Sequence, residues 1–137
     1  MKYSVNAQCP CGSGLKYKQC CLPYHKGKLP KNALVLMKSR YSGFVVADAK
    51  YIIKTTHKEN QDYTDDFNLW EKEILQFSHN GDFQKLEILE FVDGEFEAYV
   101  TFKATIFFGS EDASFIEKSK FYKIERKWLY HSGEFLG

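Results

Sequence analysis

Apolar residues recur with a helical period in the part of the chain that follows Pro30, a residue suited to the first turn of a helix. Those that predict a first helix are Leu34, Met37, Tyr41, Phe44 and Val45. A second, short helix is predicted after Asp48, because this side chain can cap a helix N-terminus. It would carry Tyr51 and Ile52 and run to about Thr55.

A third helix is predicted to begin at Thr64-Asp65-Asp66. These residue types cap helix N-termini, and the carboxylates complement the positive end of the helix dipole. Its inward-facing residues would be Leu69, Trp70 and Ile74. Asn80-Gly81 would end it, since this pair suits a helix C-terminus.

The period changes to two after Gly81, and four strands are expected, over residues 85–92, 96–108, 114–125 and 127–135. Asp93-Gly94 is a hairpin signal, and a tight turn near Arg126 joins the last two strands. The second strand has one wholly apolar face, formed by Phe96, Ala98, Val100, Phe102, Ala104, Ile106 and Phe108. Helices followed by antiparallel strands predict an α+β fold with the helices on one face of a curved sheet.

The length of 137 residues, 44% hydrophobic and 17% aromatic, predicts one domain with a buried core and at most a small appendage. No apolar run reaches the length of a membrane span, and the start MKYSVNAQCP lacks the apolar stretch of a signal peptide. We therefore expect a soluble cytoplasmic protein with no membrane insertion, in which cysteines stay reduced.

Charge is distributed unevenly along the chain. Residues 1–47 contain eight of the 19 Lys and Arg residues and no Asp or Glu, so the other 11 face all 18 acidic residues, a balance of −7. A basic front predicts an acidic partner, either RNA or an acidic protein face. An alternative with equal weight is that these cations offset a cluster of thiolates. The candidate partner-binding residues are Lys16, Lys18, Lys26 and Lys28.

All four cysteines lie in the stretch CPCGSGLKYKQCC, as the pairs Cys9/Cys11 and Cys20/Cys21. Two short pairs joined by a loop suit one zinc ion, which prefers four N or S ligands in a tetrahedron. The two glycines of CGSG permit left-handed backbone angles, which let backbone N–H groups point at the sulfurs.

Disulfides are the alternative for these thiols. Neighbouring cysteines bridge each other only with strain, a cytoplasmic setting opposes bridges between the pairs, and the Cys-x-x-Cys of redox sites is absent. We therefore predict one structural Zn²⁺ on Cys9, Cys11, Cys20 and Cys21, with no position left for catalysis. His25 is an alternative ligand, because imidazole also binds zinc, although Cys21 better completes the paired pattern.

The cysteine stretch resembles the SEC-C motif, the zinc-binding tail of the bacterial protein-translocation motor. Cys9, Cys11, Ser13, Gly14 and Cys20 match that pattern, and the motor has His where Cys21 stands. In the motor the tail contacts an export chaperone and the ribosome. Together with LMKSRYSGFV further on, the stretch resembles the YchJ-like family. This resemblance implies a zinc knuckle over residues 1–28 and a nuclear transport factor 2-like cone over residues 29–137.

A cone of this kind often encloses a pocket. The pocket candidates are Tyr41, Phe115, Glu117 and Ser119. Glu117 among aromatic residues would be a candidate general base, but a structural pairing with Arg40 or a histidine is favoured. His57 would complement a helix C-terminus, and His131 would lie on the last strand. No catalytic residue is assigned, and enzymatic activity is left open.

Three functions are compatible with this sequence. The first is an interaction module whose basic zinc knuckle docks on a ribosomal, chaperone or protein-export partner. The second is a small-molecule-binding protein or enzyme that uses the cone pocket, which would then be a closed cavity. The third is an RNA binder, in which the tyrosines among the lysines stack on bases. These tyrosines are Tyr3, Tyr17 and Tyr24.

Overall fold

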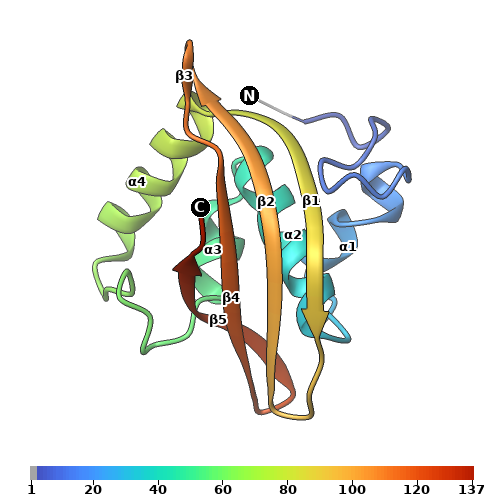
Figure 1. Cartoon of the computed structure of the whole chain (residues 1–137), viewed down its shortest axis with the longest axis vertical. Helices are drawn as coiled ribbons and strands as arrows, with labels where there is room; N and C mark the ends of the chain where they lie inside the picture. The colour runs from blue at the N-terminus through green and yellow to red at the C-terminus, as the bar shows by residue number, and fades with distance from the viewer. Residues whose placement is uncertain (1–2) are drawn as a thin grey trace.

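In the computed structural model, which describes residues 3–137, helices cover one face of a curved antiparallel sheet (Figure 1). The 3₁₀ turn η1 spans Tyr17–Gln19, and the helices are α1 Leu22–His25, α2 Ala33–Val45, α3 Ala49–Lys54 and α4 Phe67–Asn80. The strands are β1 Asp82–Val92, β2 Glu97–Phe108, β3 Glu111–Asp112, β4 Phe115–Ile124 and β5 Lys127–Phe135. The α+β prediction is confirmed.

Side-chain caps set the helix starts. Asp48 accepts a hydrogen bond from the backbone N–H of Tyr51 and caps α3 as predicted. Asp66 caps α4 in the same way. The start of α2 differs from the expectation at Pro30: Asn32 accepts a hydrogen bond from Val35 N at 2.9 Å, so the helix begins at Ala33. A capping acceptor outweighs the preset backbone angle of proline at this helix start.

Two predicted inward positions are wrong. Leu69 is 50% exposed, whereas its neighbours on α4, Trp70 and Ile74, are buried. Adjacent helix positions differ by about 100° around the axis, so Leu69 and Trp70 do not share one inner face. Phe96 is 64% exposed because it precedes β2 and lies in the hairpin connection.

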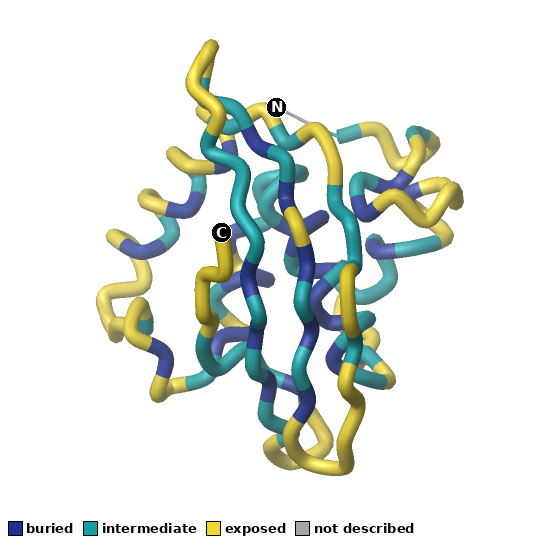
Figure 2. The backbone as a smooth tube through the Cα atoms, in the orientation of Figure 1, coloured by how far each residue is buried: buried dark blue, intermediate teal, exposed yellow. Residues whose placement is uncertain are grey.

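The sheet order is β1-β2-β4-β5, and every neighbouring pair is antiparallel. The short β3, which the sequence did not indicate, pairs with the end of β2. Figure 2 shows buried positions alternating with more exposed ones along β2. The buried positions are Ala98, Val100, Phe102, Ala104 and Ile106, and they form the main core together with residues of α2.

Residues 3–28, called the cysteine segment below, pack beside β1 and α2 (Figure 1). Val46 and Leu86 pack against the buried cysteines. The Cys9 sulfur lies 3.6 Å from Ser42 Oγ of α2. The cysteine segment is therefore attached to the body through contacts with α2 and β1.

Candidate metal centre and adjoining cavity

Tight backbone turns gather the cysteines. Gly12 and Gly14 have φ values of 83° and 87°, the left-handed angles expected for the CGSG turn. Within this turn the Cys9 N–H donates to Leu15 O at 2.8 Å, and the Gly12 N–H donates back to Cys9 O at 3.1 Å. The loop thus reverses direction between Cys9 and Leu15.

The four sulfur atoms form one compact group. They lie within 4.8 Å of one another, and Cys11 Sγ is 3.6 Å from Cys20 Sγ. All four cysteines are free of disulfide bonds. Zinc–sulfur bonds of about 2.3 Å place the corners of a tetrahedron roughly 3.8 Å apart, so the observed spacing fits this ion. The donor set and its geometry are compatible with zinc binding.

The crowding of the sulfurs has an electrostatic consequence. The pKa of Cys21 is raised because its thiol hydrogen-bonds to Cys11 and Cys9 and because it is buried. The pKa of Cys9 is lowered because its sulfur accepts hydrogen bonds from the thiols of Cys11 and Cys21. Without a cation, the cluster therefore has to retain protons. A divalent ion would allow all four sulfurs to be thiolates.

His25 lies beside the cysteines but is engaged elsewhere. Its Nε2–H donates to Ser39 O at 2.8 Å, and its Nδ1 accepts from Tyr17 Oη at 2.5 Å. Burial lowers the pKa of His25, which favours this neutral ring. Both nitrogens have protein partners, so the ring joins the cysteine segment to α2 with no nitrogen left for a metal.

The four candidate lysines are all exposed, in the segment whose shape the cysteine turn determines. Lys28 extends over the ring of Tyr24, with its Nζ 5.5 Å from the ring centroid. No ion pair involves these lysines within residues 3–137. Their charges are accessible to a partner.

A cavity of about 500 Å³ lies between α2 and the inner face of the sheet. Its lining includes all four residues predicted for a pocket, Tyr41, Phe115, Glu117 and Ser119. The walls are mostly aromatic and the cavity is partly open, which differs from the closed cavity expected. A smaller cavity of about 290 Å³ adjoins it and shares Arg40, Phe44, Asp62, Phe77 and Tyr130.

Glu117 is buried, with an exposure of 8%, and two hydroxyl groups donate to one oxygen of its carboxylate. Ser119 Oγ donates to its Oε2, and Tyr130 Oη donates to the same oxygen at 2.9 Å. Within the described chain Glu117 forms no ion pair, so the expected pairing with Arg40 or a histidine is wrong. Its Oε1 has no protein donor among residues 3–137 and is the acceptor available to a ligand.

Arg40 lines the same cavity as Glu117 and is held in place by other groups. Its Nη1 donates to Ile52 O at 3.0 Å and to Thr55 Oγ1 at 2.8 Å. Its guanidinium lies over the ring of Tyr130, 4.7 Å from the centroid. Burial lowers the pKa of Arg40 to about 10, so the group stays charged at neutral pH. Tyr130 therefore connects the two side chains, through its hydroxyl to Glu117 and through its ring to Arg40.

Gly133 is a site residue that sequence reasoning missed. It pairs with Ser119 across the sheet. A Cβ atom at this position would lie 2.6 Å from Tyr130 Oη and closer still to the Glu117 carboxylate. Glycine within a strand is a signal of close approach by another group, and the stretch HSGEF carries that signal.

The two other candidate histidines lie away from the cavity wall. His57 follows the C-cap Thr55 of α3 by two residues, so the expected role at the helix end is wrong. Its backbone N–H donates to Tyr130 O at 2.8 Å. His131 lies on β5 as predicted and packs against Tyr122, with the ring centroids 4.7 Å apart.

Residues 3–137 contain no helix with the length and apolar character that a bilayer crossing requires.

Two family models match the chain. Residues 6–23 match the SEC-C motif, and residues 32–133 match the model described as YchJ, middle NTF2-like domain. A UPF0225 protein of Enterobacter sp. (strain 638) is 38% identical over 128 residues, covering 91% of this chain and 81% of that protein. The UPF0225 protein YchJ of Shigella dysenteriae is 35% identical, with the same coverage.

A solved structure is also similar. The solution structure of a SEC-C motif containing protein from Rhodopseudomonas palustris superposes with a TM-score of 0.80 at 29% identity, covering 94% of this chain and 98% of that one. The chain therefore belongs to the UPF0225/YchJ family, in which a SEC-C motif precedes an NTF2-like domain.

Proposed function

We propose that the protein is a zinc-stabilised interaction module. One structural Zn²⁺ on Cys9, Cys11, Cys20 and Cys21 would fix the shape of residues 1–28, and residues 29–137 would form the supporting body. The observation that carries this proposal is the group of four sulfurs within 4.8 Å of one another. Four thiolates leave the ion no open position, so its role would be structural.

The partner-binding surface would be the set of exposed lysines around the metal, Lys16, Lys18, Lys26 and Lys28. Residues 1–47 carry no acidic side chain, so nothing nearby in the sequence neutralises them. Such a surface favours an acidic protein face. The resemblance of the segment to the SEC-C tail points to ribosomal, chaperone or protein-export proteins, and reduced cysteines agree with a cytoplasmic location.

Affinity capture at low salt tests this proposal. Wild type is compared with Cys20→Ser, which loses a ligand, and with the quadruple Lys→Glu variant of the four lysines. A quadruple Lys→Glu variant of exposed lysines in the body is the matched control, at Lys50, Lys72, Lys103 and Lys127. A partner retained by wild type and control, and lost from both front variants, is the expected result.

A partner that all four proteins retain, or that none retains, would contradict docking through the basic segment. A partner whose retention by the wild type is abolished by RNase would favour the RNA-binding alternative. Metal analysis of the wild type accompanies the capture and should give one zinc per chain.

The cavity favours a second candidate function, the binding of a small molecule. A volume of about 500 Å³ with aromatic walls and one free carboxylate oxygen suits a compact ligand that offers a hydrogen-bond donor. Glu117 is then a binding residue, and a general base if the ligand has an acidic proton within reach. A screen of small molecules by melting temperature should find ligands that stabilise the wild type and lose this effect in Glu117→Gln.

A further inference from the structure

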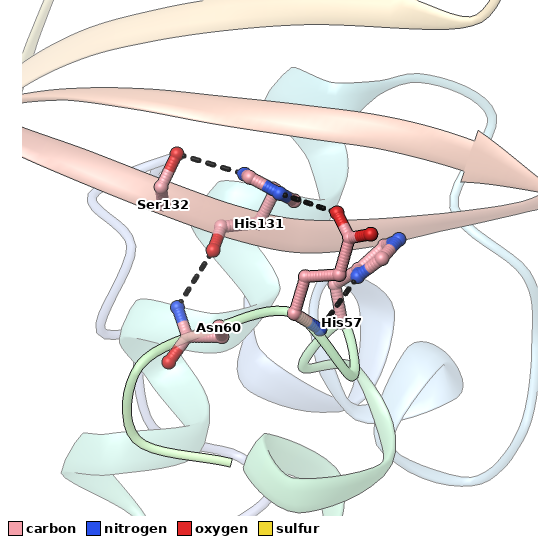
Figure 3. A network of polar contacts seen from close by, with 5 residues as sticks. His57, Asn60, His131 and Ser132 are labelled. Atoms are coloured by element: carbon pink, nitrogen blue, oxygen red, sulfur yellow. Dashed lines mark hydrogen bonds and ion pairs between the residues drawn. The ribbon is translucent and has the colours of Figure 1, made fainter.

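A second group of metal-ligating side chains lies on the outside of β5. His57, Glu59 and His131 each offer one ligand atom, and these atoms lie within 4.8 Å of one another. The group is assembled by the fold, because Glu59 and His131 are 72 residues apart in the chain. Figure 3 shows the loop after α3 meeting β5 at this point.

The backbone that carries these side chains is fixed. His57 N donates to Tyr130 O at 2.8 Å, and Tyr130 N donates to Thr55 O at 2.9 Å. The Asn60 side chain, 8% exposed, donates through Nδ2 to His131 O at 2.8 Å (Figure 3). The loop is thus attached to β5 on both sides of Glu59, which preorganises the ligand positions.

The side-chain geometry places two acceptors around one point. His131 Nε2 lies 3.0 Å from Glu59 Oε1, and His131 Nδ1 lies 2.9 Å from Ser132 Oγ (Figure 3). Without a metal, Nε2–H donates to the Glu59 carboxylate and Nδ1 accepts from Ser132 Oγ–H. When Nδ1–H instead donates to Ser132, the Nε2 lone pair faces the carboxylate, and a metal ion can bind between them in place of the proton. Hydrogen bonding at the far nitrogen of a ligating histidine is a common feature of metal sites.

His57 is the third group. Its ring centroid is 5.1 Å from that of His131, and its Nδ1 accepts the Glu59 backbone N–H at 2.9 Å. This bond occupies the Nδ1 lone pair, so His57 joins an ion only when its ring turns and a water takes the amide. His131 and Glu59 are therefore the two primary ligands.

We propose that His131, Glu59 and His57 form a second, exchangeable site for a divalent transition ion of the zinc class. Imidazole and carboxylate together suit Zn²⁺, and two or three protein ligands leave positions for water. The Glu59 side chain is 71% exposed, so the ion would exchange with solvent, in contrast to one held by the buried cysteines. This site is separate from the cysteine cluster and does not depend on the proposed partner.

Cobalt titration of tag-free, zinc-loaded protein tests the site. Co²⁺ bound by nitrogen and oxygen shows visible absorption without the near-ultraviolet thiolate-to-cobalt band that sulfur ligands give, so the two sites are distinguished. We expect one additional equivalent of Co²⁺ in the wild type, with no thiolate band, and competition by added Zn²⁺.

The variants His131→Gln and Glu59→Gln should weaken this second equivalent at least tenfold, because loss of even an outer partner typically costs about 10–100-fold in metal affinity. His79→Gln is the matched control, since His79 is an exposed histidine on α4 outside the cluster. Glu59 is exposed, so Glu59→Gln should keep the fold, and an unchanged midpoint of denaturant unfolding verifies this. A wild type without the second equivalent, an equivalent that persists in both variants, or one that shows the thiolate band would overturn the proposal.

Discussion

The cysteine segment and the body of this protein differ in what holds them together. The buried group of the segment consists of three cysteines and Tyr17. The main core of the body buries twelve residues from α2, α3 and the sheet, with ten further apolar residues packed around them. A segment of fewer than 40 residues rarely covers enough apolar surface to fold alone, so we expect its shape to depend on a cross-link such as a metal.

The body has the opposite property. Its aromatic core leaves a cavity of about 500 Å³ beside the sheet. The buried Glu117 and the partly buried Arg40 lie at the wall of that cavity. We therefore expect metal ligation to determine the shape of the segment, whereas apolar burial determines that of the body. Perturbations should therefore separate the two regions.

Loss of the metal is expected to have the largest effect. Cys20→Ser or chelation should abolish order in residues 3–28, since structural zinc contributes about 10–16 kcal/mol in zinc-finger peptides. The body should stay folded. Amide NMR spectra should show the resonances of the cysteine segment losing their dispersion. The fluorescence of Trp70 and Trp128, both in the body, should change little. Ser13→Ala, next to the Cys20 sulfur, is a mild control. A cysteine segment that stays ordered without metal would contradict the expectation that metal ligation determines its shape.

Alkaline pH should weaken the body next. Burial raises the pKa of Tyr41 and of Tyr51 to about 12 each, above the ordinary value near 10. The unfolded chain loses these protons first, so their contribution is complete below pH 10 and disappears as the pH rises through 12. Arg40, whose folded pKa is lowered to about 10, has the opposite sign and offsets one of them.

Burial also raises the pKa of Tyr17 and of Tyr130, which add to the loss, so the net loss should exceed roughly 1.4 kcal/mol per pH unit above pH 10. Urea unfolding at several pH values, followed by tryptophan fluorescence, measures it. Tyr41→Phe is the matched variant, since Tyr41 Oη has no hydrogen-bond partner within residues 3–137, and its slope with pH should become shallower. An unchanged slope in Tyr41→Phe would show that Tyr41 does not contribute.

Gly133→Ala should destabilise the body by about 1–3 kcal/mol, because the new methyl group overlaps the Glu117 carboxylate and Tyr130 Oη. The midpoint of denaturant unfolding measures this destabilisation. The metal content of the cysteine segment should not change. Gly137→Ala is the control, with nothing within 4 Å of the added atom. Equal stability of the two variants would refute the close packing around Glu117.

The smallest effect concerns the β4–β5 turn. Glu125 and Arg126 have φ values of 49° and 71°, angles that favour glycine or asparagine. Arg126→Gly should stabilise the body by about 0.5–1 kcal/mol. Lys127→Gly, one residue later in β5, should destabilise it instead. Thermal unfolding of both variants checks the signs, and two shifts of the same sign would contradict the turn assignment.

Local features of this protein were readable from the sequence. The four cysteines lie within 13 residues, so short loops alone bring their sulfurs together, and the caps Asp48 and Asp66 act on N–H groups three residues away. The inward face of β4 was also readable, because Glu117 and Ser119 alternate with outward residues. The predicted start of α2 at Pro30 was wrong, because the Asn32 side chain caps the helix and α2 begins at Ala33.

Contacts between distant segments were decided by the tertiary structure. The sequence suggested that Glu117 pairs with Arg40 or a histidine. In the fold, Tyr130, on a strand 90 residues after Arg40, contacts Glu117 through its hydroxyl and Arg40 through its ring. The same holds for Gly133 and for the group of His57, Glu59 and His131. The physical reason is that periodicity gives the face of an element, whereas the register and tilt between elements follow from how all side chains pack together.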